Sequence, residues 1–122
     1  MAKGYLIDTN ILIAFQSGTL SPASQLQVAS IIDEQFNISI VNKIEILGYK
    51  SVAKATEDFI NMANIFDLDS KVADTTITLR KVYTIKLPDA IIAATAIVNG
   101  FTLLTRNTKD FKQIKGLLIA NV

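Results

Sequence analysis

A short apolar run that stops at a carboxylate limits the folds open to this chain. Residues 5–7 are Tyr-Leu-Ile, and Asp8 follows them directly. A strand that is buried on both faces is continuously apolar, whereas an unpaired carboxylate is very costly to bury. Asp8 is therefore expected at the carboxyl edge of a central strand, which is where open α/β sheets bind their ligands.

The remaining sequence alternates between strand-like and helix-like segments. Strands are predicted at residues 4–8, 36–41, 65–69, 101–105 and 116–120, and helices at residues 9–17, 22–35, 43–49, 52–63, 70–83 and 87–98. Such alternation is typical of a parallel sheet with helices on both faces. A chain of 122 residues without a linker or an internal repeat is expected to form one domain, residues 1–122.

The composition excludes several kinds of chemistry. The chain has no His and no Cys, which rules out histidine-based triads, thiol catalysis, disulfides and ordinary zinc sites. The formal net charge is only +1, so an anionic partner must be held by a local basic patch or through metal ions. No apolar run approaches the ~20 residues that a membrane span needs. We therefore expect a cytoplasmic protein that enters structure near its first residue and has no signal peptide.

Four acids occupy comparable places in this pattern. Asp8 ends the first strand, Glu45 follows the second, Asp89 begins the helix before the fourth, and Asp110 lies just after the fourth. Each could simply cap or complement a helix, and Asn42-x-x-Glu45 has the spacing of a capping box. If they converge, however, their mutual repulsion requires a cation, and carboxylates suit Mg²⁺ or Mn²⁺.

The remaining acids serve as a comparison for these four. We expect a solvated position for those within or at the far ends of helices, which are Asp33, Glu34, Glu57, Asp58 and Asp74. Asp69 could reach the same edge of the sheet, but a helix cap is the simpler explanation for an acid at a strand end.

Four stretches together resemble the PIN-domain nucleases, and within them the small VapC-type toxins of toxin–antitoxin pairs. They are residues 6–10 (L-I-D-T-N), Glu45, residues 87–96 (L-P-D-A-I-I-A-A-T-A) and residues 104–111 (L-T-R-N-T-K-D-F). The resemblance covers nearly the whole chain, and the last two stretches are the specific ones. It implies a three-layer α/β/α fold on a central parallel sheet and a Mg²⁺- or Mn²⁺-dependent endoribonuclease.

The resemblance also implies roles for individual residues. It makes Asp8, Glu45 and Asp89 metal ligands, with Thr9, Asn10 and Thr105 as polar supports. The fourth acidic position of the family falls on Asn107 or on Asp110, and both readings remain open. Asp110 is kept as a catalytic candidate and Asn107 as a polar support. The resemblance further implies RNA products with a 5′-phosphate and a 3′-hydroxyl, a homodimer, and a cognate antitoxin.

Substrate contacts are expected from basic residues near these acids. Arg106, Lys109, Lys112 and Lys115 cluster after the fourth strand, and Lys43 precedes Glu45. Their spacing fits a phosphate-binding patch and a solvated helix face equally well. For the antitoxin, we expect docking on the exposed apolar faces of the helices at residues 11–15 and 55–65.

Two other functions of doubly wound α/β proteins need acids that this chain lacks. A phosphoacceptor receiver domain needs a second acid beside the first and a late lysine, and a haloacid-type phosphatase needs Asp-x-Asp, whereas this chain has Asp8-Thr9-Asn10. The closer alternatives keep the same fold: a PIN nuclease that acts on other RNA or on DNA, or a catalytically weak RNA-binding module.

Overall fold

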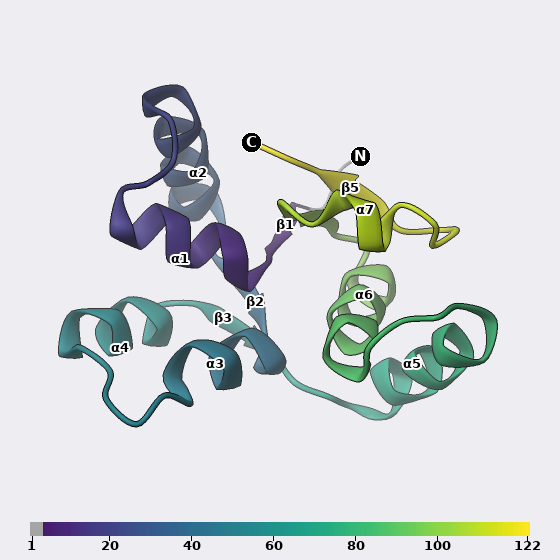
Figure 1. Cartoon of the computed structure of the whole chain (residues 1–122). Coiled ribbons are helices and arrows are strands. Elements are labelled where there is room, and N and C mark those ends of the chain that lie inside the picture. The colour runs from purple at the N-terminus through teal and green to yellow at the C-terminus, as the bar shows by residue number, and fades with distance from the viewer. Residues whose placement is uncertain (1–3) are drawn as a thin grey trace.

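Short parallel strands form the centre of the molecule (Figure 1). The computed structural model describes residues 4–122, in which there are five strands of three residues each. β1 (Tyr5–Ile7), β4 (Thr102–Leu104) and β5 (Leu118–Ala120) form a parallel sheet in the order β1-β4-β5, and β2 (Asn37–Ser39) pairs in parallel with β3 (Asn64–Phe66). All five are shorter than predicted, and β1 and β2 end early because helices begin at Thr9 and at Ile40.

The β2-β3 pair lies beside β1, joined to it through a side chain. Asn37 is fully buried, and its Nδ2 donates to the Tyr5 carbonyl at 3.1 Å and to Gln35 Oε1 at 2.9 Å. Its Oδ1 accepts from Asn64 Nδ2 at 3.2 Å. A buried carbonyl must find a donor, and here a side-chain amide supplies it in place of a backbone ladder bond.

Seven helices flank the strands within residues 4–122. They are α1 (Thr9–Ser17), α2 (Pro22–Glu34), α3 (Ile40–Leu47), α4 (Lys54–Asn61), α5 (Ser70–Val82), α6 (Leu87–Asn99) and the short α7 (Thr108–Phe111). In the part of the chain that the structure describes, none of them has both the length and the apolar character needed to cross a bilayer.

Two cores lie on opposite faces of the strands, because neighbouring strand residues point in opposite directions. Leu6 and Leu103 belong to a cluster with α5 and α6, whereas Ile7 and Leu104 belong to one with α1 and α2. Figure 1 shows α1 and α2 on one side of the strands and α5 and α6 on the other. The predicted three-layer α/β/α fold with a central parallel sheet is therefore confirmed.

The start of α3 differs from the prediction, which placed it at residue 43 behind an Asn42 cap. α3 begins at Ile40, and its N-cap is Ser39. Ser39 Oγ accepts from the Asn42 backbone N–H at 3.1 Å, while Asn42 Oδ1 accepts from the Ser39 backbone N–H at 2.9 Å. The capping box thus joins Ser39 to Asn42, and it leaves Glu45 free of the capping role considered for it.

The apolar helix faces were predicted less accurately than the helices. The helical spacing of Leu26, Ala29, Ile31 and Ile32 predicts that Leu26 lies on the buried side of α2, but Leu26 is 74% exposed and Val28 is the buried residue of that helix. Ile77 of α5 is likewise 53% exposed, because the buried face of that helix is Val72, Thr76 and Leu79.

The acids outside the candidate cluster behave as expected. Those predicted to lie on solvated surfaces, Asp33, Glu34, Glu57, Asp58 and Asp74, are exposed. Asp69 is the N-cap of α5 and accepts from the Val72 backbone N–H at 2.9 Å.

Candidate active site

Asp8 lies where β1 ends and α1 begins, and it is only 5% exposed. Its Oδ1 accepts from the Thr9 backbone N–H at 2.8 Å, which caps α1. Its Oδ2 accepts from Thr105 Oγ1 at 2.8 Å and more weakly from Asn10 Nδ2 at 3.4 Å. Asp8 therefore caps α1 and at the same time contacts a side chain from the end of β4.

Two opposing influences act on the charge of Asp8. Burial raises the pKa of the Asp8 carboxyl, and the nearby charge of Glu45 raises it further. Hydrogen bonds from Thr105, Thr9 and Asn42 lower this pKa, but the net direction is upward. The carboxylate is thus oriented by its donors yet remains short of compensating positive charge.

Asn42 connects Asp8 to the α3 side of the site, and sequence reasoning missed this role. It is fully buried, and its Nδ2 donates to Thr9 Oγ1 at 3.0 Å and to Asp8 Oδ1 at 3.5 Å. Thr9 Oγ1 in turn donates to Glu45 Oε1 at 2.7 Å. The Ser39-x-x-Asn42 spacing could have revealed the capping box, but only the fold shows that its amide reaches Asp8.

Asp89 reaches the same edge of the sheet because α6 runs antiparallel to the strands. α6 leads into β4, which is parallel to β1, so the start of α6 lies near the strand end that carries Asp8. Burial raises the pKa of Asp89, and the charges of Asp8, Glu45 and Asp110 each raise it further. Asp89 therefore lies within electrostatic reach of the other three predicted carboxylates, and the start of α6 lies where the prediction required it.

The fourth position proves to be a bonded pair. Asn107 Nδ2 donates to Asp110 Oδ2 at 2.8 Å, and the Asn107 backbone N–H donates to Thr105 Oγ1 at 3.0 Å. Since Thr105 also bonds Asp8, an unbroken chain of hydrogen bonds joins Asp110 to Asp8. Asn107 and Asp110 therefore lie together at this corner.

Asn10 closes the arrangement on the α1 side. Its Nδ2 lies 3.4 Å from Thr105 Oγ1, and its Oδ1 accepts from the Arg106 backbone N–H at 3.2 Å. The three predicted polar supports, Thr9, Asn10 and Thr105, thus all contact Asp8 or Glu45.

The donor set fits a hard divalent cation by its chemistry. It consists of carboxylate oxygens, and the pKa values of two of the carboxyl groups, Asp8 and Asp89, are raised. Bound positive charge would lower both pKa values. Within residues 4–122, no three of these carboxylates are yet close enough to enclose an ion. Glu45 is exposed, and its Oε1 accepts from Thr9 Oγ1 at 2.7 Å.

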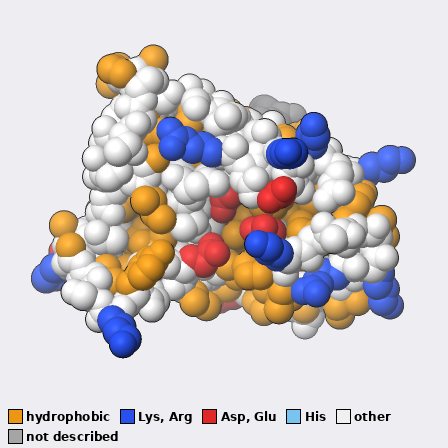
Figure 2. Space-filling view, viewed as in Figure 1, with side chains coloured by type: hydrophobic (Ala, Val, Ile, Leu, Met, Phe, Trp, Pro, Cys, Tyr) orange, Lys and Arg blue, Asp and Glu red, His pale blue; other side chains and the backbone are white. Residues whose placement is uncertain are grey.

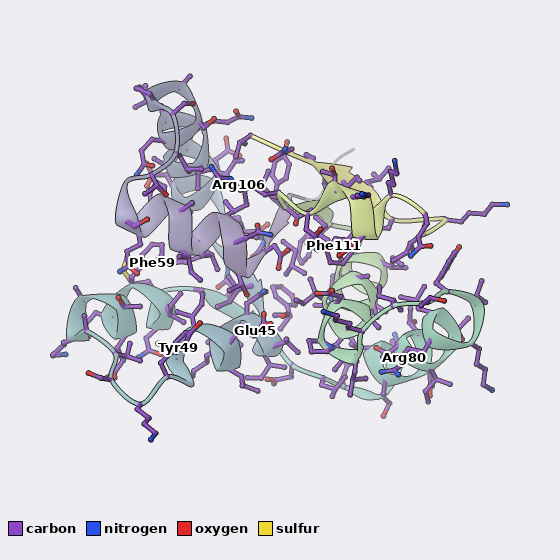
Figure 3. All side chains as sticks on the ribbon, in the orientation of Figure 1. Glu45, Tyr49, Phe59, Arg80, Arg106 and Phe111 are labelled. Atoms are coloured by element: carbon purple, nitrogen blue, oxygen red, sulfur yellow. The ribbon has the colours of Figure 1, made fainter. Side chains whose placement is uncertain are left out.

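The predicted basic residues are not all placed alike. Lys109 lines a cavity together with Asp89 and Asp110. Arg106 is exposed and anchored through its backbone, and Lys112 is exposed at the end of α7. Figure 2 shows acidic side chains gathered near the middle of this face with basic side chains around them, and Figure 3 shows Glu45 and Arg106 on opposite sides of α1 in that view.

Lys43 and Lys115 complete the predicted set. Lys43 is half-buried in the first turn of α3, two residues before Glu45. Lys115 is exposed, and its backbone N–H donates to the Tyr83 hydroxyl at 3.0 Å.

Comparison with known proteins gives consistent matches over almost the full chain. The sequence profile of the PIN domain matches residues 5–117. The chain is 30% identical over 132 aligned residues to a Rickettsia felis protein named "Ribonuclease VapC1", covering 98% of this chain and 96% of that protein.

Solved structures give the same picture. A chain of a toxin–antitoxin complex from Klebsiella pneumoniae is 34% identical with a TM-score of 0.72, covering 94% of this chain and 96% of that one. A chain of DNA-bound VapBC from Salmonella typhimurium superposes with a TM-score of 0.81 at 23% identity, covering 99% of this chain and 98% of that one, which shows a shared fold.

Proposed function

The chain belongs to the PIN-domain family, and on that basis we propose that it is a Mg²⁺- or Mn²⁺-dependent endoribonuclease and the toxin of a VapBC-type pair. The convergence of Asp8, Glu45, Asp89 and Asp110 on one edge of the sheet carries the proposal. A chain without His and Cys has carboxylates as its means of activating water at a phosphodiester.

Asp8, Glu45 and Asp89 are the residues that would hold the metal. When bound, the ion lowers the pKa of water and offsets negative charge on the scissile phosphate. Thr105 and the Thr9 backbone N–H hold Asp8 in one orientation through bonds of 2.8 Å each. Thr9 Oγ1 orients Glu45. Asp110, oriented by Asn107, is the further acid available to accept a proton from water.

The substrate is RNA, and basic side chains around the acids bind its phosphates. Lys43, Arg106, Lys109 and Lys112 supply positive charge near the site and would neutralise phosphates on either side of the scissile bond. With a net charge of only +1, the chain depends on this local arrangement. Increasing ionic strength should therefore weaken substrate binding steeply.

The test of this function is cleavage of single-stranded RNA with the product ends mapped. We expect cleavage with Mg²⁺ or Mn²⁺, products bearing 5′-phosphate and 3′-hydroxyl ends, and loss of activity in Asp8→Asn. Asp33→Asn, an exposed acid of α2, serves as the matched control and should remain active. Cleavage that survives EDTA, or that leaves a cyclic phosphate, contradicts the proposal, and preferential cleavage of DNA in the same panel would favour the non-toxin alternative.

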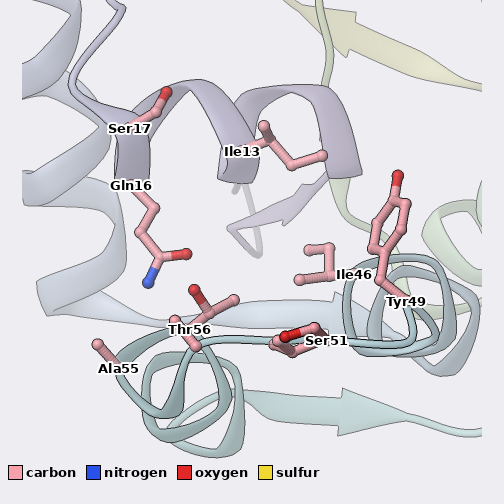
Figure 4. A pocket seen from close by; sticks show the side chains of 10 residues that line it. Ile13, Gln16, Ser17, Ile46, Tyr49, Ser51, Ala55 and Thr56 are labelled. Carbon is pink, nitrogen blue, oxygen red and sulfur yellow. The ribbon is translucent and has the colours of Figure 1, made fainter.

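A cognate antitoxin is the proposed protein partner, and an apolar groove is its proposed docking site. The groove has a volume of about 630 Å³ and lies between α1, the α3–α4 connection and α4. Figure 4 shows Ile13 and Ile46 facing it, with Tyr49 at one end. Ile13 is 47% exposed and Tyr49 67%. A 34% identical relative occurs in a toxin–antitoxin complex, which supports an apolar segment of such a partner as the occupant.

Co-purification with the product of the neighbouring gene tests this partner. We expect a complex that Ile13→Glu disrupts. Ile77→Glu, on an equally exposed isoleucine of α5 that does not line the groove, should leave the complex intact. We also propose a homodimer in the cytoplasm, for which light scattering of the purified chain should give twice the mass of one chain.

A further inference from the structure

A second cavity opens beside the carboxylates. It has a volume of about 610 Å³ and lies between the end of α5, the loop before α6, and α7. Asp89 and Asp110 form part of its wall, so it is continuous with the candidate active site. Three cations, Arg80, Lys86 and Lys109, form the rest of its charged lining. Two of them, Arg80 and Lys86, were not predicted as substrate contacts.

These cations are available to an external anion. Among residues 4–122 the only ion pair closer than 4 Å is Lys54–Asp58, on α4. Arg80, Lys86 and Lys109 therefore make no ion pair with any described acid, although two carboxylates share the cavity with them. All three are exposed, which leaves their charged groups accessible from the cavity; Arg80 is labelled on α5 in Figure 3.

The walls that carry these cations are tied to each other. Gln113 Nε2 donates to the Thr84 carbonyl at 3.5 Å and to the Asp110 carbonyl at 3.4 Å. The Lys115 backbone N–H donates to the Tyr83 hydroxyl at 3.0 Å. These contacts join the loop that precedes Lys86 to the segment that follows Lys109. The two walls of the cavity are therefore joined to each other by hydrogen bonds.

We infer that this cavity binds the phosphodiester group next to the one that is cleaved, with Arg80 and Lys86 as its principal contacts. The inference rests on the proposed ribonuclease function, because it places a neighbouring phosphate of the same RNA strand beside the acids. The planar guanidinium of Arg80 can bind two phosphate oxygens at once, and Lys86 adds a point charge. The cavity is within the size range of ordinary ligand pockets, so it also has room for part of the attached nucleotide.

RNA affinity measured in EDTA, where binding is separated from cleavage, tests the inference. A fluorescein-labelled single-stranded RNA of mixed sequence is titrated with the wild-type chain, Arg80→Gln, Lys86→Gln and the double variant, and anisotropy is recorded at several salt concentrations. Each single change should weaken binding about three- to five-fold, as expected for an exposed charge pair. The double variant should also reduce the slope of log affinity against log salt by about 0.7, the value for one phosphate on a single strand, and each single change should remove part of it.

The matched control is Lys81→Gln. Lys81 is adjacent to Arg80 on α5 and exposed, but it does not line the cavity. Its substitution should change neither the affinity nor the salt slope. Arg80→Lys should restore the slope while recovering only part of the affinity, because the charge returns without the planar fork. Equal melting temperatures across the set will show that the variants are folded.

The possible outcomes separate this inference from the proposed function. If the double variant binds RNA with wild-type affinity and slope, or if Lys81→Gln is weakened as much, the inference is overturned even where cleavage is intact. If the double variant loses affinity but no metal supports cleavage by the wild-type chain, the enzyme proposal fails and the binding site stands. In an active enzyme, the loss should appear in KM rather than in kcat.

Discussion

Replacing Thr105 with valine removes the hydrogen bond that most lowers the pKa of Asp8. Thr105 is fully buried, and its hydroxyl donates to Asp8 Oδ2 at 2.8 Å while accepting from the Asn107 backbone N–H at 3.0 Å. Valine keeps the branched shape but makes neither bond. A hydrogen bond to a charged acceptor contributes about 1.5–3 kcal/mol, and the stranded backbone N–H adds to the loss. We therefore expect Thr105→Val to lower the free energy of unfolding by about 2–4 kcal/mol at neutral pH.

The effect should depend on pH in a definite direction. The Thr105 hydroxyl lowers the pKa of Asp8, whereas burial raises it above its ordinary value. Valine therefore raises the folded-state pKa of Asp8 further. A carboxyl with a raised folded-state pKa contributes stability that is fully present below its unfolded pKa of about 3.9 and is lost as the pH rises through the folded value. The variant loses more of this stability, so its deficit should be largest at pH 7 and smallest near pH 4.

Urea unfolding in EDTA at pH 7 and near pH 4 measures this difference. The matched control is Thr95→Val, because Thr95 is only 1% exposed and donates at 2.7 Å to the neutral Ile91 carbonyl. Its loss should be about 1 kcal/mol and the same at both pH values. At about 4 °C per kcal/mol, thermal melting should show the same ranking. An equal deficit for Thr105→Val at both pH values would refute the charged-acceptor argument.

Three further experiments test the acids of the site and the capping box beside them. Asp89→Asn should raise the melting temperature of the metal-free chain, because burial and the like charges around it raise the pKa of Asp89. The same change should abolish RNA cleavage, and a lower melting temperature would contradict the proposed cost of the charge. Mg²⁺ should raise the wild-type melting temperature more at pH 7 than near pH 4, since Asp8 and Asp89 must be ionised to bind it; an equal shift at both pH values argues against binding at these acids. Asn42→Leu should lower the free energy of unfolding, measured in urea, by about 2–3 kcal/mol. The change removes the buried capping amide and leaves Ser39 without its hydrogen-bond partner. A loss below about 0.5 kcal/mol would show that the amide is dispensable.

The residues that were predicted share a local signal. Asp8 and Asp89 follow or precede strongly apolar runs, and the buried strand and helix around them force a charged group to the edge of the sheet. Parallel strand order then brings both to one edge, since α6 must return antiparallel before β4. The fold could therefore be predicted from the pattern of segments, whereas the place of Asp89 at this edge was implied by the resemblance to the PIN-domain nucleases, because the pattern alone does not show where its helix starts.

The residues that were missed depend on contacts between distant segments. The sequence predicts Asn42 as a helix cap because Ser39 falls within the predicted strand, and the contact of its amide with Asp8 joins residues 34 positions apart. Arg80 and Lys86 belong to α5 and the following loop, whereas Lys109 belongs to α7, and the cavity they share is a product of packing. Leu26 was assigned to a buried face because its position fits a helical period that α2 does not bury.

The Asn37 amide that joins β2 to β1 has a mechanical consequence. Among the described residues, β1 and β2 share no backbone ladder. On its other side β1 is paired with β4, and β2 is paired with β3. Asp8 belongs to one half and Glu45, which follows β2, to the other. A side-chain bridge resists shear less than a row of backbone bonds, and here hydrogen bonds of the Asn37 and Asn42 side chains join the two halves. The two carboxylates of the proposed metal site thus approach it from opposite sides of a junction that is held by side chains and not by a backbone ladder.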